Sequence, residues 1–314
     1  MATEPVLITT SRPSPAAHVH SPFTVATYAR VADYWALTKP DVNFLIVVAT
    51  LTGFYLASPG PLHNVPLLLL VHTLLGTLLV ASGTGTLNQY AELHFDAQMR
   101  RTARRPLAAG RLKPSVALSF GVALSAVGGV YLAVAVSPLA SLLAVLTLLS
   151  YLFMYTPLKR KTPLCTLVGA FPGAMPTLIG WAAASGKLTL EASILYAILF
   201  LWQFPHFMAI AWMYREDYDR AGYRVLPAVR LRGGFISWMT VLPILALIVV
   251  SLVRAVMGHH SFVYSVGVVM LGSIFLYYGI QLALRKSNSG ARRLLYVSIF
   301  YLPLVFVAMM IDKG

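Results

Sequence analysis

Three oxygen-bearing side chains stand four residues apart at the end of a long apolar stretch. They are Asn88, Glu92 and Asp96. On a helix, the spacing i, i+4, i+8 would place them in one stripe. Amide and carboxylate oxygens are the ligands that Mg²⁺ prefers, and Mg²⁺ leaves its other positions to water and substrate phosphates. The stripe therefore predicts a magnesium site that would take a phosphorylated substrate.

Charge of both signs is concentrated in two loops of this sequence. The chain has only ten acidic residues, and half of them are Glu92, Asp96, Glu216, Asp217 and Asp219. Arginines follow Glu92 and Asp96 directly, and one guanidinium group can donate two parallel hydrogen bonds to a phosphate. Basic loops also orient membrane proteins, which would explain the arginines alone but not the acids. Acids beside bases predict a site for a metal-diphosphate complex.

The composition shows what kind of scaffold must hold these loops. The 314 residues are 58% hydrophobic and 11% charged, and the mean hydropathy is +0.74. Soluble domains carry about 25% charged residues. Long apolar runs without strand-like alternation predict an all-α, polytopic membrane helical bundle and exclude a barrel. The single cysteine, Cys165, excludes an internal disulfide and a cysteine-based metal site.

Nine apolar stretches predict nine transmembrane helices. They cover residues 42–58, 65–87, 115–135, 138–156, 164–184, 189–211, 236–257, 262–283 and 294–311. With this count, all but three of the 24 Lys and Arg residues fall on one side, the exceptions being Lys187, Arg254 and Lys313. Because basic loops stay in the cytoplasm, we expect a cytoplasmic N-terminus and an external C-terminus.

Residues 1–30 are polar and rich in Ser, Thr and Pro, which predicts a disordered N-terminal tail before a transmembrane domain at 31–314. The tail lacks the apolar core of a secretory signal. We expect a multi-pass protein of the bacterial inner membrane. The alternative is the mitochondrial inner membrane, with the tail as a transit peptide. The net charge of +14 is explained by the membrane, so no nucleic-acid partner is expected.

Histidines inside apolar stretches are candidate functional residues. His206 follows Pro205, which would kink the sixth stretch and free backbone carbonyls near the end that carries Asp217. A substrate contact and a packing role are equally good interpretations of His206. For His72 the same two interpretations stand, while His94 would lie on another face than the acids.

Several motifs in the right order resemble the UbiA superfamily of intramembrane prenyltransferases, in its haem-modifying branch. The first is Asn88-x3-Glu92-x3-Asp96, continued by Met99, Arg101, Thr102, Arg105, Pro106, Leu107 and Gly110. The others are LTKPDV (37–42), residues 155–181, WQFPHF (202–207) and DYDRAGYRVLP (217–227), so the resemblance covers residues 35–311. Glu92 stands where the family usually has Asp. In the second loop, Tyr214 and Tyr218 flank Asp217, unlike the paired acids of quinone-type relatives.

The resemblance implies transfer of the farnesyl group of farnesyl diphosphate to a vinyl group of haem B, giving haem O. It implies that Mg²⁺ is held by Asn88, Glu92, Asp96 and Asp217. It implies diphosphate binding by Arg101, Arg105, Lys159, Arg160 and Arg215. The expected substrate contacts are Tyr155, His206, Tyr214 and Tyr218.

The helix interior would accept the farnesyl tail from the lipid bilayer, and the candidate protein partners are a haem A synthase or a terminal oxidase assembly partner. One alternative is another acceptor, such as a quinone precursor. Another is a membrane transporter, although transporter sites lie near the midplane and these acids gather at one face.

Overall fold

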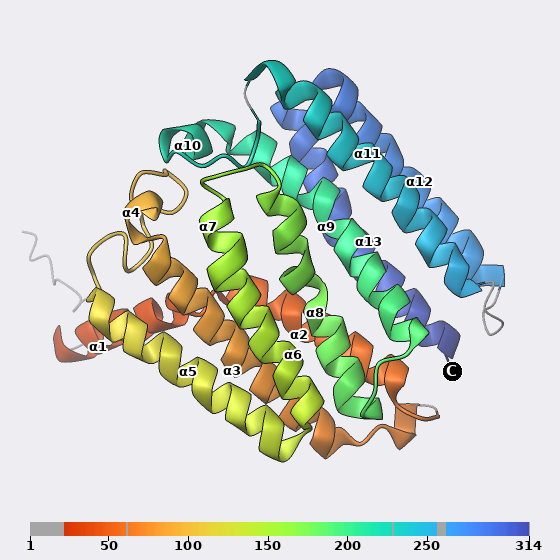
Figure 1. The fold of residues 1–314 in the computed structure, drawn as a ribbon, viewed down its shortest axis with the longest axis horizontal. Coiled ribbons are helices and arrows are strands. Elements are labelled where there is room, and N and C mark those ends of the chain that lie inside the picture. The colour runs from red at the N-terminus through yellow and green to blue at the C-terminus, as the bar shows by residue number, and fades with distance from the viewer. Residues whose placement is uncertain (1–21, 61, 228, 256–261, 314) are drawn as a thin grey trace, which may run out of the picture.

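The computed structural model describes residues 22–60, 62–227, 229–255 and 262–313. These residues form helices and contain no strand (Figure 1). Nine of the helices they form are long and apolar enough to cross a membrane, which confirms the all-α bundle and its count of nine spans. The side of the membrane on which each end lies stays a prediction.

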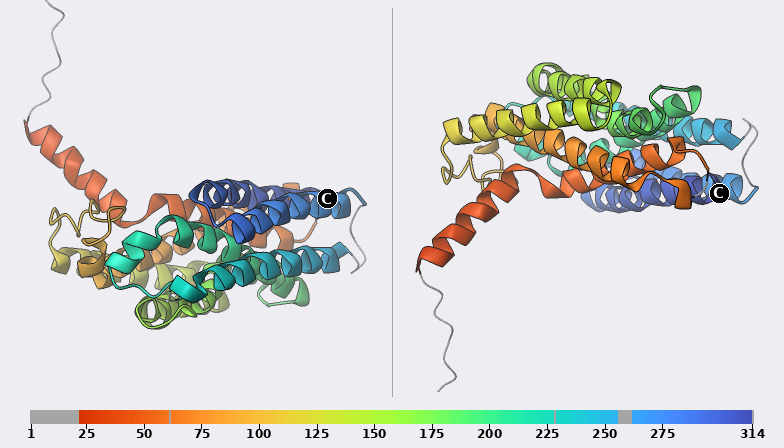
Figure 2. Two further views of the ribbon diagram at one scale, coloured as in Figure 1. Left: turned by 90° about the horizontal axis from the view of Figure 1, so that it is seen from above. Right: turned by 90° about the horizontal axis from the view of Figure 1, so that it is seen from below.

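The spans run in chain order through the bundle. They are α2 (Pro40–Ala57), α3 (Leu67–Ala91), α5 (Pro114–Ala135), α6 (Pro138–Leu149) with its continuation to Leu158, α8 (Cys165–Ser185), α9 (Leu190–Met213), α11 (Val229–Arg254), α12 (Phe262–Arg285) and α13 (Asn288–Lys313). Short elements connect them: η1 (Leu62–Asn64), α4 (Leu93–Asp96), η2 (Ser150–Tyr155), α7 (Thr156–Leu158) and α10 (Arg215–Arg220). Helix α1 (Pro22–Leu37) precedes them and projects away from the bundle (Figure 2).

The helices pack both against their neighbours in the chain and against helices distant in sequence. Helix α3 lies on α5 and α2 on α8, while α9 contacts α8, α11 and α13. The crossing of α2 and α8 requires glycine. A Cβ on Gly53 would lie 2.1 Å from the Thr177 carbonyl oxygen, and one on Gly180 would lie 2.0 Å from that of Thr50. Small residues are the usual means of bringing membrane helices this close, because packing replaces the hydrophobic effect in lipid.

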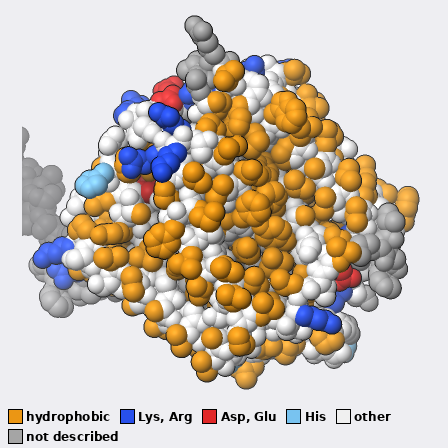
Figure 3. All heavy atoms as spheres, viewed as in Figure 1, with side chains coloured by type: hydrophobic (Ala, Val, Ile, Leu, Met, Phe, Trp, Pro, Cys, Tyr) orange, Lys and Arg blue, Asp and Glu red, His pale blue; other side chains and the backbone are white. Residues whose placement is uncertain are grey.

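The charged and apolar surfaces are separated in space. Hydrophobic side chains cover most of the face seen in Figure 3, while Lys, Arg, Asp and Glu gather at its upper left, where α4 and α10 lie. Large apolar side chains on the outside of the helices are exposed, as with Val134 and Phe153. An exterior of this kind suits contact with lipid tails.

Some helices begin earlier than the apolar runs predict. Helix α1 starts at Pro22, so the expected tail at 1–30 overlaps it, and residues 1–21 lie outside the described residues. Helix α11 starts at Val229 and α13 at Asn288, where 236 and 294 were expected. The reason is physical: Lys and Arg can sit in a helical first turn and extend their stems along apolar surface to the headgroups.

Candidate functional site

The first acidic loop, residues 92–111, follows α3 and differs from the single helix expected there. Helix α3 ends at Ala91, and Glu92 adopts φ −100° and ψ 7° before the short helix α4 begins. The backbone N–H of Glu92 still donates to Asn88 O at 3.0 Å, and that of Asp96 to Glu92 O at 2.8 Å. The helix is therefore interrupted at Glu92, but each of these two hydrogen bonds still joins residues four apart in the sequence, as in an α-helix.

Asn88 is buried and uses both ends of its amide. Its Oδ1 accepts a 2.6 Å hydrogen bond from Lys39 Nζ. Its Nδ2 donates to Thr156 Oγ1 at 3.1 Å, and that hydroxyl donates to Tyr151 O at 2.8 Å. Asn88 therefore ties the end of α3 to the start of α2 and to the π-helical segment η2.

Lys39 was not among the expected site residues, and its backbone is unusual. It sits in the left-handed region, at φ 56° and ψ 62°, directly before Pro40. A non-glycine residue there costs of order 1–3 kcal/mol, which surrounding structure must offset. Gln89 Nε2 supplies part of that support by donating to Leu37 O at 3.0 Å. Burial, and then the nearby Arg105, lower the pKa of Lys39 to about 7.

Glu92 and Lys159 form a buried ion pair between the first acidic loop and the end of the fourth span. Glu92 Oε1 lies 2.8 Å from Lys159 Nζ. Burial opposes both charges, yet Lys159 holds the pKa of Glu92 below its ordinary value and Glu92 holds that of Lys159 well above. The Lys159 ammonium also lies 4.5 Å from the centre of the Tyr155 ring. The pair is charged at neutral pH.

Asp96 is 2% exposed and has one oxygen satisfied and one unsatisfied. Its Oδ2 lies 2.6 Å from Arg105 Nη1. Its Oδ1 is buried and has no hydrogen-bond partner among the described residues. A buried, unpartnered carboxylate oxygen is costly unless something else binds it. Such an oxygen is free to ligate a hard cation.

The second acidic loop, residues 214–226, lies against the first. Asp217 on α10 accepts from the Arg101 backbone N–H at 3.3 Å through Oδ2 and pairs with Arg220 Nη1 at 3.0 Å through Oδ1. Apolar side chains join the loops: Met99, Ala221 and Tyr223 are buried together, with Phe95 against them. Arg224 N also donates to Lys159 O at 2.6 Å. These contacts bring Asp217 to the first acidic loop.

The other expected phosphate-binding residues contact aromatic rings or other helices. The Arg101 guanidinium lies 5.2 Å from the Tyr214 ring centre, and that of Arg160 lies 4.4 Å from the Phe95 ring centre. Arg215 points elsewhere: its Nη1 donates to Asn288 Oδ1 at 2.6 Å and to Trp212 O at 2.8 Å. Its Nη2 also lies 3.7 Å from the exposed Glu216, and these contacts turn Arg215 toward the start of α13 rather than toward the buried acids.

Within the described ranges, no three His, Cys, Asp or Glu side chains form a group that could hold a metal by themselves. Instead, each acid of the charged cluster is paired with a base: Glu92 with Lys159, Asp96 with Arg105, and Asp217 with Arg220. The donor set still fits a magnesium ion that keeps water and phosphate ligands: it consists of hard oxygen atoms, and Asp96 Oδ1 is unpartnered. The cations beside the acids fit the diphosphate that such an ion would accompany.

An apolar cavity of about 350 Å³ opens beside the cluster, between α2, α3, α6, α8 and α9. Lys39 and Tyr155 line it, and farther in lie Trp202, Gln203 and His206. The π-helical turn η2 directs Tyr151 and Tyr155 to this cavity while Phe153 stays exposed. The Tyr155 ring packs where a side chain on Gly169 would clash, since a Cβ there would lie 2.6 Å from it. Single π-turns recur at functional sites.

Among the expected aromatic residues, Tyr155 and His206 line this cavity and Tyr214 lies under Arg101. Tyr218 packs edge-on against Tyr223 between the two acidic loops, with ring centres 6.0 Å apart.

Four site residues were missed at the sequence level: Lys39, Arg220, Tyr151 and Tyr223. Burial and Glu92 raise the pKa of the Tyr223 phenol, which lies beside that carboxylate. The sequence does contain one indication of Lys39, because it is a lone base directly before the first span.

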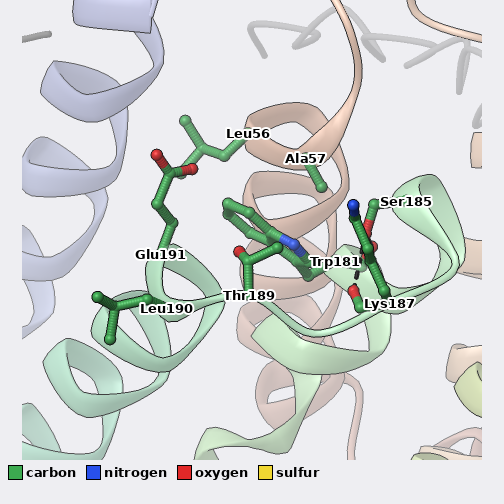
Figure 4. Close-up of a pocket in the computed structure, with 8 residues that line it drawn as sticks. All are labelled: Leu56, Ala57, Trp181, Ser185, Lys187, Thr189, Leu190 and Glu191. Carbon is green, nitrogen blue, oxygen red and sulfur yellow. Dashed lines mark hydrogen bonds between the residues drawn. The ribbon is translucent and has the colours of Figure 1, made fainter.

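A second cavity, of about 400 Å³, lies at the opposite end of the bundle (Figure 4). It is lined where α2 and α8 end and α9 begins, with Trp181, Lys187 and Glu191 among its residues. Ser185 Oγ donates to Lys187 O at 2.8 Å across its rim. Its one acid and one base contrast with the several pairs at the two loops, so the loop end is the stronger candidate site.

This sequence and fold are similar to those of known proteins. A protein named protoheme IX farnesyltransferase, from Solibacter usitatus, is 49% identical over 90% of this chain and 98% of its own length. A solved structure of a digeranylgeranylglyceryl phosphate synthase covers 91% of this chain with a TM-score of 0.73 at 17% identity. The structure of a UbiA homolog from Archaeoglobus fulgidus bound to GPP and Mg²⁺ covers 88% with a TM-score of 0.62 at 13% identity.

Residues 46–304 match the UbiA prenyltransferase family. That match spans seven of the nine membrane helices in full and most of the first and the last, and it includes both acidic loops. Together with the relative at 49% identity, it settles the classification. The chain is an integral membrane protein that belongs to the UbiA prenyltransferase family.

Proposed function

We propose that this prenyltransferase joins the farnesyl group of farnesyl diphosphate to a vinyl group of haem B and so makes haem O. One observation carries the choice of acceptor: the protein named protoheme IX farnesyltransferase from Solibacter usitatus is 49% identical over 90% of this chain. The geometry supports the reaction class, because a buried cluster of acids and bases adjoins an apolar cavity. Polar chemistry and an isoprenoid tail need these two environments side by side.

The charged cluster would bind the diphosphate and help it leave. When bound, Mg²⁺ would neutralise diphosphate charge and would be held by Asn88, Glu92, Asp96 and Asp217. The nearby cations add to that neutralisation, with Arg105, Lys159 and Lys39 each already within 2.8 Å of a site oxygen. Stabilising the developing negative charge in a partly buried site lowers the barrier far more than it would in water.

The cavity would hold the farnesyl chain and the reacting carbons. Its apolar lining excludes water from the allylic centre until carbon–carbon bond formation. The rings of Tyr151 and Tyr155, whose centres lie 5.0 Å apart, border the cavity near Lys39. Aromatic faces stabilise cationic centres, so these rings suit an electron-poor farnesyl carbon.

The atoms of the net reaction balance with water as the third reactant. The bond between the farnesyl carbon and the diphosphate oxygen breaks, and diphosphate leaves with the electron pair. A new bond forms between that carbon and the terminal carbon of the vinyl group. The hydroxyl of water adds to the other vinyl carbon, and a proton is released.

We place the protein in the bacterial plasma membrane with both acidic loops on the cytoplasmic face. The distribution of Lys and Arg supports this orientation. Farnesyl diphosphate is anionic and would reach the loops from the cytoplasm, while its tail and haem B enter from the bilayer. Haem O would pass to a haem A synthase or to terminal oxidase assembly.

The test is expression in cells that lack their own haem O synthase, with extracted haems separated by chromatography and identified by mass. We expect haem O from the wild-type chain and haem B alone from an Asp96→Ala variant inserted to the same level. Haem B alone from well-inserted wild-type protein would refute the proposal. A prenylated quinone precursor in those cells would assign the chain to another acceptor.

A further inference from the structure

His206 is held rigidly at the wall of the apolar cavity. Its ring lies on Trp202, with centres 4.6 Å apart and planes inclined by 26°. Its Nδ1 lies 2.8 Å from Ser298 Oγ on α13. Trp202 Nε1 in turn donates to Ser298 O at 2.8 Å. Helices α9 and α13 thus fix the orientation of the imidazole from two directions.

The partners of Ser298 determine which nitrogen of His206 carries the proton. A serine hydroxyl has one hydrogen, and that of Ser298 is donated to Leu295 O at 2.6 Å. Ser298 Oγ can therefore only accept from His206, so Nδ1 carries the proton. In the neutral ring the lone pair then lies on Nε2. A metal-binding histidine has this arrangement: the far nitrogen donates a hydrogen bond that sets the tautomer and orients the ring.

The cavity offers few other ligands for a transition metal. Among its described lining residues, His206 is the only histidine, and no cysteine or methionine accompanies it. The amide nitrogen of Gln203 donates to Ala170 O at 3.0 Å, and Lys39 is bonded to Asn88 at the charged end. Imidazole is a common ligand of iron, whereas amides and neutral phenols are weak ones. The cavity thus presents one unprotonated imidazole nitrogen in apolar surroundings.

We propose that His206 Nε2 is the axial ligand of the haem iron while haem B is bound as the acceptor. The inference rests on the proposed function and assigns a role to one residue of that site. His206 stands seven residues before the end of α9, about 10 Å along the helix from the acidic loops. Iron bound there would anchor the haem at the wall of the cavity, beside the space proposed for the farnesyl chain.

The experiment titrates haem B into the full-length protein in lipid nanodiscs and records absorption spectra, including the ferrous–carbonyl form. We expect the wild type to show the spectrum of histidine-ligated haem. In His206→Ala that spectrum should be lost and the Kd for haem should rise at least about tenfold. Added imidazole should restore the spectrum at concentrations that do not ligate haem in nanodiscs without protein, which shows that the variant still holds haem.

Two further variants make the result specific. His72→Ala removes the histidine that is bonded to Tyr131 on α5, and it should leave spectrum and affinity unchanged. Ser298→Ala keeps the ligand but removes the acceptor for Nδ1–H, so it should keep the spectrum and weaken affinity by about tenfold.

An unchanged spectrum and Kd in both His206→Ala and His206→Gln would overturn the assignment. If the wild type makes haem O in that case, only the ligand inference fails. Conversely, histidine-ligated haem in a wild type that makes no haem O would refute the proposed function and leave the ligand in place.

Discussion

The two acidic loops differ in how they bury and pair their charges. In the first, Glu92 and Asp96 are 5% and 2% exposed, and Glu92 is paired with a base 67 residues away. In the second loop, Asp217 is the one buried acid, with 8% of its surface exposed, while the side chains of Glu216 and Asp219 are 79% and 51% exposed. Asp217 and its neighbours pair with arginines close in sequence.

This difference separates a charged centre from a surface that supports it. Taking a charge out of water costs several kcal/mol unless it is paired, so buried charges are kept where they have a use. Exposed pairs such as Asp219 with Arg232 contribute about 0–1 kcal/mol. We infer that the first loop carries most of the chemistry, and that the second supplies one carboxylate and an apolar contact.

The largest effect should come from Asp96→Ala. This change removes the carboxylate whose Oδ1 is buried without a partner, and we expect kcat/KM for farnesyl transfer to fall at least about a hundredfold. Arg105, with a quarter of its side chain exposed, can turn to water, so insertion should be normal. Product analysis by mass, at matched protein levels, gives the rate. Full activity would show that Asp96 does not act on the diphosphate complex.

A pair of substitutions within the second loop comes next. Asp217→Asn removes a buried charge that contacts the first loop, and we expect a loss of tenfold or more in kcat/KM, roughly the size of one charge-assisted interaction. Asp219→Asn, two residues away and exposed, should stay within about twofold. Steady-state kinetics on both variants measures the contrast. Equal losses would mean that the second loop acts as a whole and that burial does not mark its functional acid.

Two Lys-Pro sequences at helix starts give the third comparison. Lys39 precedes Pro40 and bonds Asn88, whereas Lys113 precedes Pro114, is extended at φ −69° and is exposed. We expect Lys39→Ala to lower kcat/KM about tenfold, because the hydrogen bond that holds Asn88 Oδ1 in place is lost. Lys113→Ala should change it little. Similar kinetics for the two variants would remove Lys39 from the site.

The smallest effect should come from Glu92→Asp. The carboxylate remains but retreats by one methylene from Lys159, which is 2.8 Å away and has a flexible stem that can follow. We expect a loss of only a few-fold, while Glu92→Gln should cost more because it leaves Lys159 buried without a counter-charge. If kcat/KM falls more in Glu92→Asp than in Glu92→Gln, the length of the side chain at residue 92 matters more than its charge.

Much of the fold could be predicted because lipid leaves few choices for a backbone. Apolar runs of the right length fixed the number of spans, and each predicted span overlaps a helix. Helix starts were less predictable, since Arg292 and Arg293 can stand in a membrane helix. The π-turn at 150–155 has no sequence signature of its own, because it depends on how the fourth span packs.

The site could be predicted in part for a similar reason. Spacing alone pointed to Asn88, Glu92 and Asp96, because helix periodicity is local. The partners of these residues come from distant segments, and no local pattern shows that Lys39 adopts a left-handed conformation or that Arg215 turns to Asn288. Tertiary contacts decide both.

We propose above all that this chain farnesylates haem B with the help of a divalent cation. The most direct test gives purified protein in nanodiscs farnesyl diphosphate and Mg²⁺ with equal amounts of haem B and a quinone precursor. Mass spectrometry should find haem B heavier by one farnesyl group and one hydroxyl, and a metal chelator should abolish that product. A farnesylated quinone precursor with unmodified haem B, or full haem O formation in the presence of the chelator, would contradict the account.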